Sequence, residues 1–75
     1  MLFFKKKGEK ELENILFELR SNLENNYKDS AHAARKILIV RCEELYAQGK
    51  ISEKAREKYT RLYNEYTEKM KDYHH

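Results

Sequence analysis

Aromatic residues recur at heptad spacing near the C-terminal end of the chain. The seven-residue repeat is carried by Tyr59, Tyr66 and Tyr73, and Leu62 falls close to an intervening seam position. Residues at this spacing lie along one side of an α-helix and require a neighbouring helix to cover them. The pattern predicts a helix over about residues 53–72 that packs against other helices.

A second apolar pattern predicts a helix over about residues 9–25. Its apolar residues repeat at steps of three and four, the spacing of one helical face: Leu12, Ile15, Leu16, Leu19 and Leu23. The polar run over residues 25–30 then interrupts the pattern. Asp29 or Ser30 is a suitable N-cap for the helix that follows, because a short polar side chain can accept a backbone N–H there.

The middle of the chain predicts a helix over about residues 31–47, because alanines and glutamates with strong helix propensity flank its apolar centre. The residues expected to face inward are Ala34, Ile37, Leu38, Cys42 and Leu45. Gly49 is expected to end this helix, since glycine adopts the left-handed C-cap conformation without steric cost. Ser52 is expected to cap the third helix.

Residues 37–40 are four consecutive apolar residues, Ile-Leu-Ile-Val. On a helix they cover more of the circumference than one neighbouring helix in a hairpin can bury. A short buried strand is the alternative, since Ile and Val favour β structure, but the flanking residues favour helix and the chain offers no partner strand. We therefore expect contacts on two or three sides, from the same chain or from a second subunit. The predicted interface residues are Ile37, Ile39, Val40, Tyr59, Leu62, Tyr66 and Tyr73.

The predicted fold class is all-α: a three-helix bundle, or a long helical hairpin with a short N-terminal helix, assembled as a homo-oligomer. A 75-residue chain buries only about 60% of its unfolded surface, and its single cysteine cannot form an internal disulfide. Oligomerisation is then the remaining way to enlarge the core. Residues 1–8 join four apolar residues to three lysines and are expected to form a flexible basic tail or to fill a groove in the oligomer. Residues 9–75 form a single helical domain.

The composition agrees with long, surface-charged helices, because 39% of the residues are charged, proline is absent and glycine occurs twice. The net charge is −3 over residues 8–27, where five glutamates outnumber Lys10 and Arg20, and +3 for the whole chain. An acidic first helix that lies beside basic helices accounts for this distribution. A protein that binds nucleic acid by charge would carry a stronger field of one sign.

The lone cysteine and the lack of a secretion signal indicate a reducing, cytoplasmic location. The apolar run at residues 1–4 is too short for a signal peptide or for a membrane-spanning helix. Together with three lysines it could touch an anionic membrane surface, but one short patch does not anchor a protein stably. We expect no stable membrane insertion.

The run Leu45-Tyr46-Ala47-Gln48-Gly49-Lys50-Ile51-Ser52 is the most specific short motif of the chain. It has the form of a helix end, a glycine cap, an aliphatic residue that packs under the turn and a serine that caps the next helix. With its surroundings, residues 38–62, it resembles the SHOCT domain, a short helical module with a Gly-x-Ile-Ser/Thr turn. The resemblance implies an oligomerisation or partner-binding role. The alternative is that Gly-Lys-Ile-Ser is simply a well-formed turn between antiparallel helices.

Basic residues offer a second class of candidate site. The residues that could contact a phosphate or an acidic partner are Lys28, His32, Arg35, Lys36 and Arg61. Contact with the acidic first helix is the alternative role for those on the second helix. The run over residues 58–63 also interleaves cations with tyrosines, which could stack on the bases of RNA or of single-stranded DNA. A DNA-reading helix-turn-helix is disfavoured, since glutamates would face the phosphate-lined groove.

No residue pair supports catalysis. Cys42 lies in an apolar stretch, where it is expected to be a small core residue, and His32 falls on a different helical face. Two adjacent histidines at positions 74 and 75 do not form a structural metal site, so neither a metal nor another cofactor is predicted. The sequence predicts a non-enzyme: a helical oligomerisation or protein-interaction module that binds itself and another protein. The alternative is an RNA- or DNA-associated accessory protein with weak binding.

Overall fold

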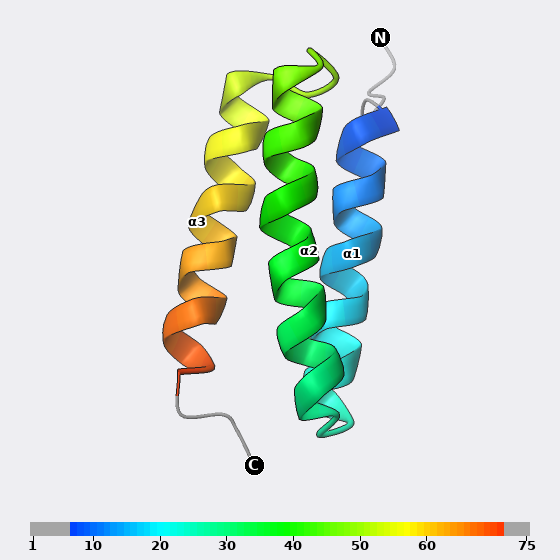
Figure 1. Ribbon diagram of the computed structural model, residues 1–75, viewed down its shortest axis with the longest axis vertical. Coiled ribbons are helices and arrows are strands. Elements are labelled where there is room, and N and C mark those ends of the chain that lie inside the picture. Colours follow the sequence, from blue (N-terminus) through cyan, green and yellow to red (C-terminus); the bar gives the residue numbers. More distant parts are fainter. Residues whose placement is uncertain (1–6, 72–75) are drawn as a thin grey trace, which may run out of the picture.

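The structure, a computed structural model, describes residues 7–71 and contains three helices in that range. These are α1 (Lys7–Glu24), α2 (Lys28–Ala47) and α3 (Glu53–Lys69). Figure 1 shows them running alternately down and up, with α2 between α1 and α3. Both outer helices pack along α2. The all-α prediction is confirmed for the described residues, which include no strand.

The turn between α1 and α2 is tighter than the sequence suggested. Asn26 adopts a left-handed conformation with φ of 64°, its N–H donates to the Leu23 carbonyl, and the N–H of Tyr27 donates to the Asn22 carbonyl. These two bonds form a Schellman cap that closes α1. Because the chain reverses within this cap, α2 begins at Lys28, and Tyr27 is its N-cap without a side-chain hydrogen bond. The expectation that Asp29 or Ser30 caps α2 is wrong.

The turn between α2 and α3 confirms the predicted caps. Gly49 has φ of 73° and donates to the Tyr46 carbonyl at 3.0 Å, and Lys50 donates to the Leu45 carbonyl at 2.8 Å. This is again a Schellman cap, now with glycine at the left-handed position. The hydroxyl of Ser52 accepts the N–H of Ala55 at 3.1 Å, which caps α3.

One apolar core joins the three helices. On α2 the buried residues recur at three- and four-residue steps, and we call this set the inner seam: Ala31, Ala34, Leu38, Cys42 and Leu45. The inner seam faces the leucines of α1 and the inward residues of α3. The rest of the core consists of Leu12, Leu16, Leu19, Ile51, Ala55, Tyr59 and Met70. No polar or charged residue in the described range is buried.

The first helix begins earlier than predicted, at Lys7. Gly8 was expected to belong to a flexible tail over residues 1–8, but it is buried at the start of α1. A Cβ at Gly8 would lie 2.9 Å from the Ile51 side chain and 3.0 Å from the Lys50 carbonyl oxygen. Glycine therefore lets the start of α1 approach the α2–α3 turn. The rest of the proposed tail, residues 1–6, lies outside the described residues.

Candidate interaction surface

The outward side of α1 and α2 exposes large apolar side chains. Phe17 is 71% exposed, Ile37 51% and Val40 54%. Phe17 and Ile37 line a shallow groove of about 410 Å³, together with the small residue Ala33. We call the set Phe17, Ala33, Ile37 and Val40 the outer face. Because large apolar side chains cluster here on a highly charged protein, this is the candidate site.

The outer face exists because α2 carries two heptad patterns on different sides. The second pattern has alternating steps of four and three residues, and each of its members is exposed. We call this set the outer seam: Ala33, Ile37, Val40, Glu44 and Ala47. The prediction that Ile37 faces inward is wrong, since the inner seam runs through Leu38 and a helix cannot turn two adjacent residues to the same side. Ile39 is half-buried. The excess of apolar residues noted at positions 37–40 thus ends up on the outer surface.

Tyr59 is part of the core of the chain. Its ring is 0% exposed, and its hydroxyl donates to a carboxylate oxygen of Glu13 on α1 at 2.5 Å. Burial and the neighbouring Glu13 carboxylate raise the pKa of Tyr59, because both disfavour the phenolate. The predicted interface role of Tyr59 is therefore wrong for this conformation: the ring is covered by its own helices and presents no surface to a partner.

Of the other interface residues predicted on the C-terminal helix, two are half-buried and one lies outside the described residues. Leu62 and Tyr66 are half-buried and pack against the core. The hydroxyl of Tyr66 accepts a hydrogen bond from Arg20 Nε of α1 at 2.9 Å. These contacts join α3 to α1 within one chain. Tyr73 lies outside the described residues.

Part of the predicted basic site is engaged in contacts between helices of the same chain. Arg35 Nη1 donates to Thr67 Oγ1 on α3 at 3.0 Å, and its guanidinium carbon lies 5.3 Å from the centroid of the Tyr63 ring. Arg35 therefore connects α2 to α3, not to the acidic α1. Lys28 and His32 are half-buried, whereas Lys36 and Arg61 are exposed on different helices. Arg61 therefore lies on a different helix from the other four residues.

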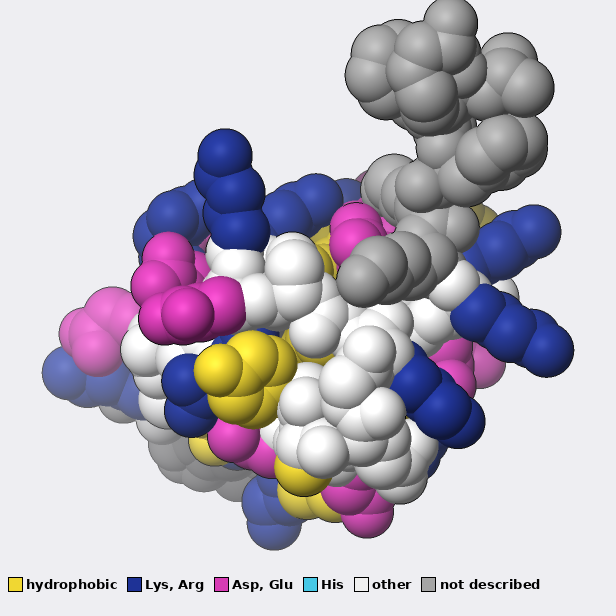
Figure 2. All heavy atoms as spheres, turned by 90° about the horizontal axis from the view of Figure 1, so that it is seen from above, with side chains coloured by type: hydrophobic (Ala, Val, Ile, Leu, Met, Phe, Trp, Pro, Cys, Tyr) yellow, Lys and Arg dark blue, Asp and Glu magenta, His cyan; other side chains and the backbone are white. Residues whose placement is uncertain are grey.

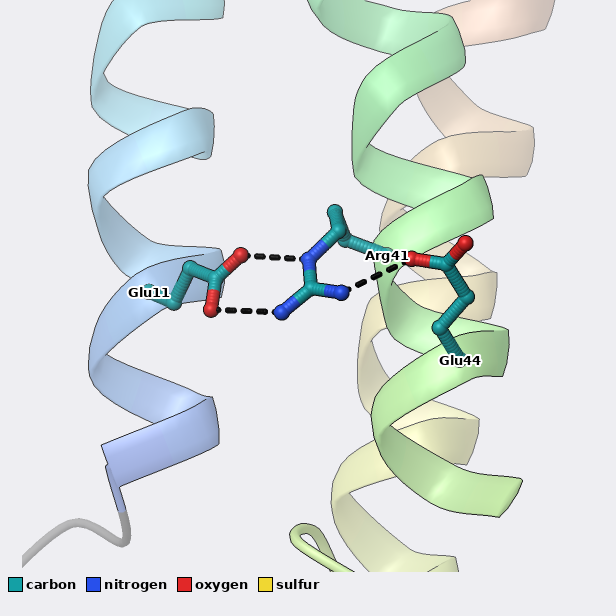
Figure 3. A network of polar contacts seen from close by, with 3 residues as sticks. All are labelled: Glu11, Arg41 and Glu44. Carbon is teal, nitrogen blue, oxygen red and sulfur yellow. Dashed lines mark hydrogen bonds and ion pairs between the residues drawn. The ribbon is translucent and has the colours of Figure 1, made fainter. Parts of the chain in front are cut away.

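The sequence predicts that the acidic α1 lies beside basic helices, but it does not identify the ion-pair network that Glu11, Arg41 and Glu44 form. Figure 3 shows the Arg41 guanidinium between two carboxylates: it donates to both oxygens of Glu11, at 2.5 and 2.9 Å, and to Glu44 Oε1 at 2.8 Å. The Arg41 side chain holds the pKa of Glu11 below its usual range by hydrogen bonding to the carboxylate. A bidentate pair fixes orientation as well as distance. The network joins α1 to α2 at the rim of the apolar core.

The Cys42 thiol is buried, 3.8 Å from the carbonyl oxygen of Arg56, and burial raises its pKa, which disfavours the reactive thiolate. Within residues 7–71, no group of three or more His, Cys, Asp or Glu residues is placed to hold a metal ion. Across the same range, no helix has the length and apolar character needed to cross a membrane.

Charges of both signs cover the end of the molecule that carries the α2–α3 turn. Figure 2 shows basic and acidic side chains interspersed around this end. Part of the mixture comes from cross-helix pairs, such as Arg56 with Glu43 at 3.0 Å and Lys58 with Glu13 at 3.5 Å. Such pairing lowers the net field available to attract an anionic polymer.

Comparison with known proteins gives no match: no family model, no curated protein and no solved structure matches the chain. The resemblance of residues 38–62 to the SHOCT domain stays a prediction. The candidate site is accordingly defined by the geometry of the chain itself.

Proposed function

We propose that this chain is a small, non-catalytic helical module that oligomerises through its outer face and binds another protein. The observation that supports this most is the exposure of Phe17, Ile37 and Val40, each more than half exposed, on one side of the α1–α2 pair. A cluster of exposed large apolar residues marks a surface that binds a partner. The SHOCT-like resemblance implies the same class of role.

The distribution of apolar residues over α2 supports the proposal further. The inner seam completes the core without Ile37 or Val40, and about half of each of these two side chains, 51% and 54%, stays exposed in the isolated chain. Burying apolar surface is favourable by about 25 cal/mol per Å². A partner that covers these side chains would stabilise the complex by this free energy, whereas in the isolated chain the exposed apolar surface stays in water.

We expect the purified chain to self-associate. Static light scattering on the size-exclusion peak, at micromolar concentration, should give a mass of at least twice the 9.1 kDa of one chain. The physical reason is the burial of the outer face against another copy. A mass of 9.1 kDa across the whole concentration range would contradict the oligomerisation part of the proposal.

We expect only weak, salt-sensitive binding of nucleic acid. The ring of Tyr59 is buried and that of Tyr63 lies under Arg35, so neither is a free platform for base stacking. The exposed cations Lys54 and Lys58 share their groove with Glu9. Fluorescence anisotropy with mixed-sequence RNA and DNA at physiological salt should show no tight, selective complex. Submicromolar binding that weakens in Arg61→Glu would favour the nucleic-acid alternative instead.

A further inference from the structure

We propose that the occupant of the outer face is a second copy of this chain, with the two α2 helices packed antiparallel about a two-fold axis that passes near Val40. The inference rests on the proposed function and names the partner and the arrangement. It follows from the symmetry of the outer seam, from the charges beside it and from the groove next to Phe17.

A two-fold axis at Val40 brings Val40 opposite its own counterpart and the two ends of the outer seam opposite each other. In an antiparallel pair of identical helices, residues that are equally far from the axis on opposite sides face each other, so one patch meets the same patch. With the axis at Val40, Ala33 of one copy faces the partner subunit's Ala47, because both are seven residues from the centre. Ile37, three residues from the centre, faces the partner subunit's Glu43, whose carboxylate binds Arg56 of its own chain. The small alanines at the two ends let the helices approach closely, as knobs-into-holes packing requires.

The charges beside the seam favour the same register. Lys36 makes no ion pair with any described residue of its own chain. With the axis at Val40, Lys36 faces the partner subunit's Glu44, four residues from the centre on the other side. Glu44 uses Oε1 to bind Arg41, and Figure 3 shows its second oxygen pointing away from that arginine. An opposite charge at this position stabilises the pair.

A register with the axis at Ile37 is less favourable. It would place Glu44 opposite the partner subunit's Ser30 and next to its Asp29. Two carboxylates would then approach each other, and Lys36 would face an inner-seam residue, where no acidic group lies. Repulsion between like charges selects against this register.

Phe17 extends the contact from α2 onto α1. It lines the groove with Ala33 and Ile37. This groove lies on the Ala33 side of the axis, which faces the C-terminal end of the partner's α2. The groove beside Phe17 therefore receives the segment around the partner subunit's Ala47, where side chains are small. This contact covers the most exposed large apolar side chain of the described residues, at 71%.

Cysteine cross-linking in the full chain tests the arrangement. Under mild oxidation, Val40→Cys should form a disulfide-linked dimer, because the two cysteines meet on the axis. Ala33→Cys alone and Ala47→Cys alone should cross-link at least tenfold less, since each residue lies about 21 Å along the helix from its own counterpart, beyond the ~7 Å limit for a disulfide. A mixture of Ala33→Cys and Ala47→Cys should form the mixed dimer. The native chain, whose Cys42 is buried, is the background control.

The outcomes separate this inference from the proposed function. A native chain that is dimeric by light scattering, but in which Val40→Cys does not cross-link, would overturn the arrangement and leave oligomerisation standing. Equal cross-linking of the three single variants would also overturn it, because it would show collisions without a register. A monomeric native chain would overturn both. Circular dichroism confirms that each variant keeps its helices, as expected for exposed positions.

Discussion

Tyr59→Ala is expected to lower the free energy of unfolding by roughly 3 to 5 kcal/mol, because it removes a fully buried ring from the centre of the core. A 75-residue domain has a total stability of roughly 4 to 11 kcal/mol, so the variant should be largely unfolded or close to it. Urea denaturation followed by circular dichroism measures the effect.

Two controls separate the contributions of Tyr59. Tyr59→Phe keeps the ring but removes the hydroxyl that donates to Glu13, and it should cost about 1 kcal/mol. Tyr27→Ala removes a ring that is 59% exposed and should change stability by less than about 0.5 kcal/mol. If Tyr59→Ala unfolded at the same urea concentration as the native chain, the described core would be wrong.

Gly8→Val is expected to be the second largest change, at about 1 to 3 kcal/mol of lost stability. The new Cβ would meet the Ile51 side chain at 2.9 Å and the Lys50 carbonyl at 3.0 Å. The carbonyl belongs to backbone that is held by the α2 cap, where the Lys50 N–H binds Leu45, so it cannot easily move away. Thermal and urea denaturation should both shift to lower midpoints.

Lys10→Val is the matched control for Gly8→Val, because it places the same β-branched side chain at an exposed position of the first turns of α1. It should leave stability within about 0.5 kcal/mol of the native value. A second comparison uses Gly49, whose Cβ would meet nothing within 4 Å but whose φ is 73°. Gly49→Asn should be tolerated better than Gly49→Ala, since asparagine adopts the left-handed conformation more readily. A fully stable Gly8→Val would show that α1 does not pack against the turn.

Periodicity and cap chemistry predicted the three helices and the α2–α3 turn, because these are local properties. Gly49 and Ser52 act within four residues of themselves, and the structure confirms both. The start of α2 could not be predicted in the same way. Asn26 is not glycine, yet it closes α1 in a left-handed conformation, and because the chain reverses within this cap, α2 begins at Lys28, before Asp29 or Ser30.

The orientation of the helices was harder to predict than their existence. Four consecutive apolar residues at positions 37–40 do not show which of them faces inward, and the choice depends on the rotation of α2 against both neighbours. That rotation is accompanied by cross-helix contacts such as Arg41 with Glu11 and Arg35 with Thr67, which join residues about 30 positions apart. Tyr59 illustrates the same point, because its heptad spacing predicted a seam but not whether the seam lies inside one chain or between two.

The inner seam folds the chain, and we propose that the outer seam binds a second copy. Sedimentation equilibrium of the native chain and of Val40→Glu tests it most directly. Two carboxylates near the two-fold axis should raise the dissociation constant about 100-fold, while the exposed position leaves the fold intact. We predict twice 9.1 kDa for the native chain and 9.1 kDa for an equally helical Val40→Glu. Equal masses for the two proteins would contradict the claim.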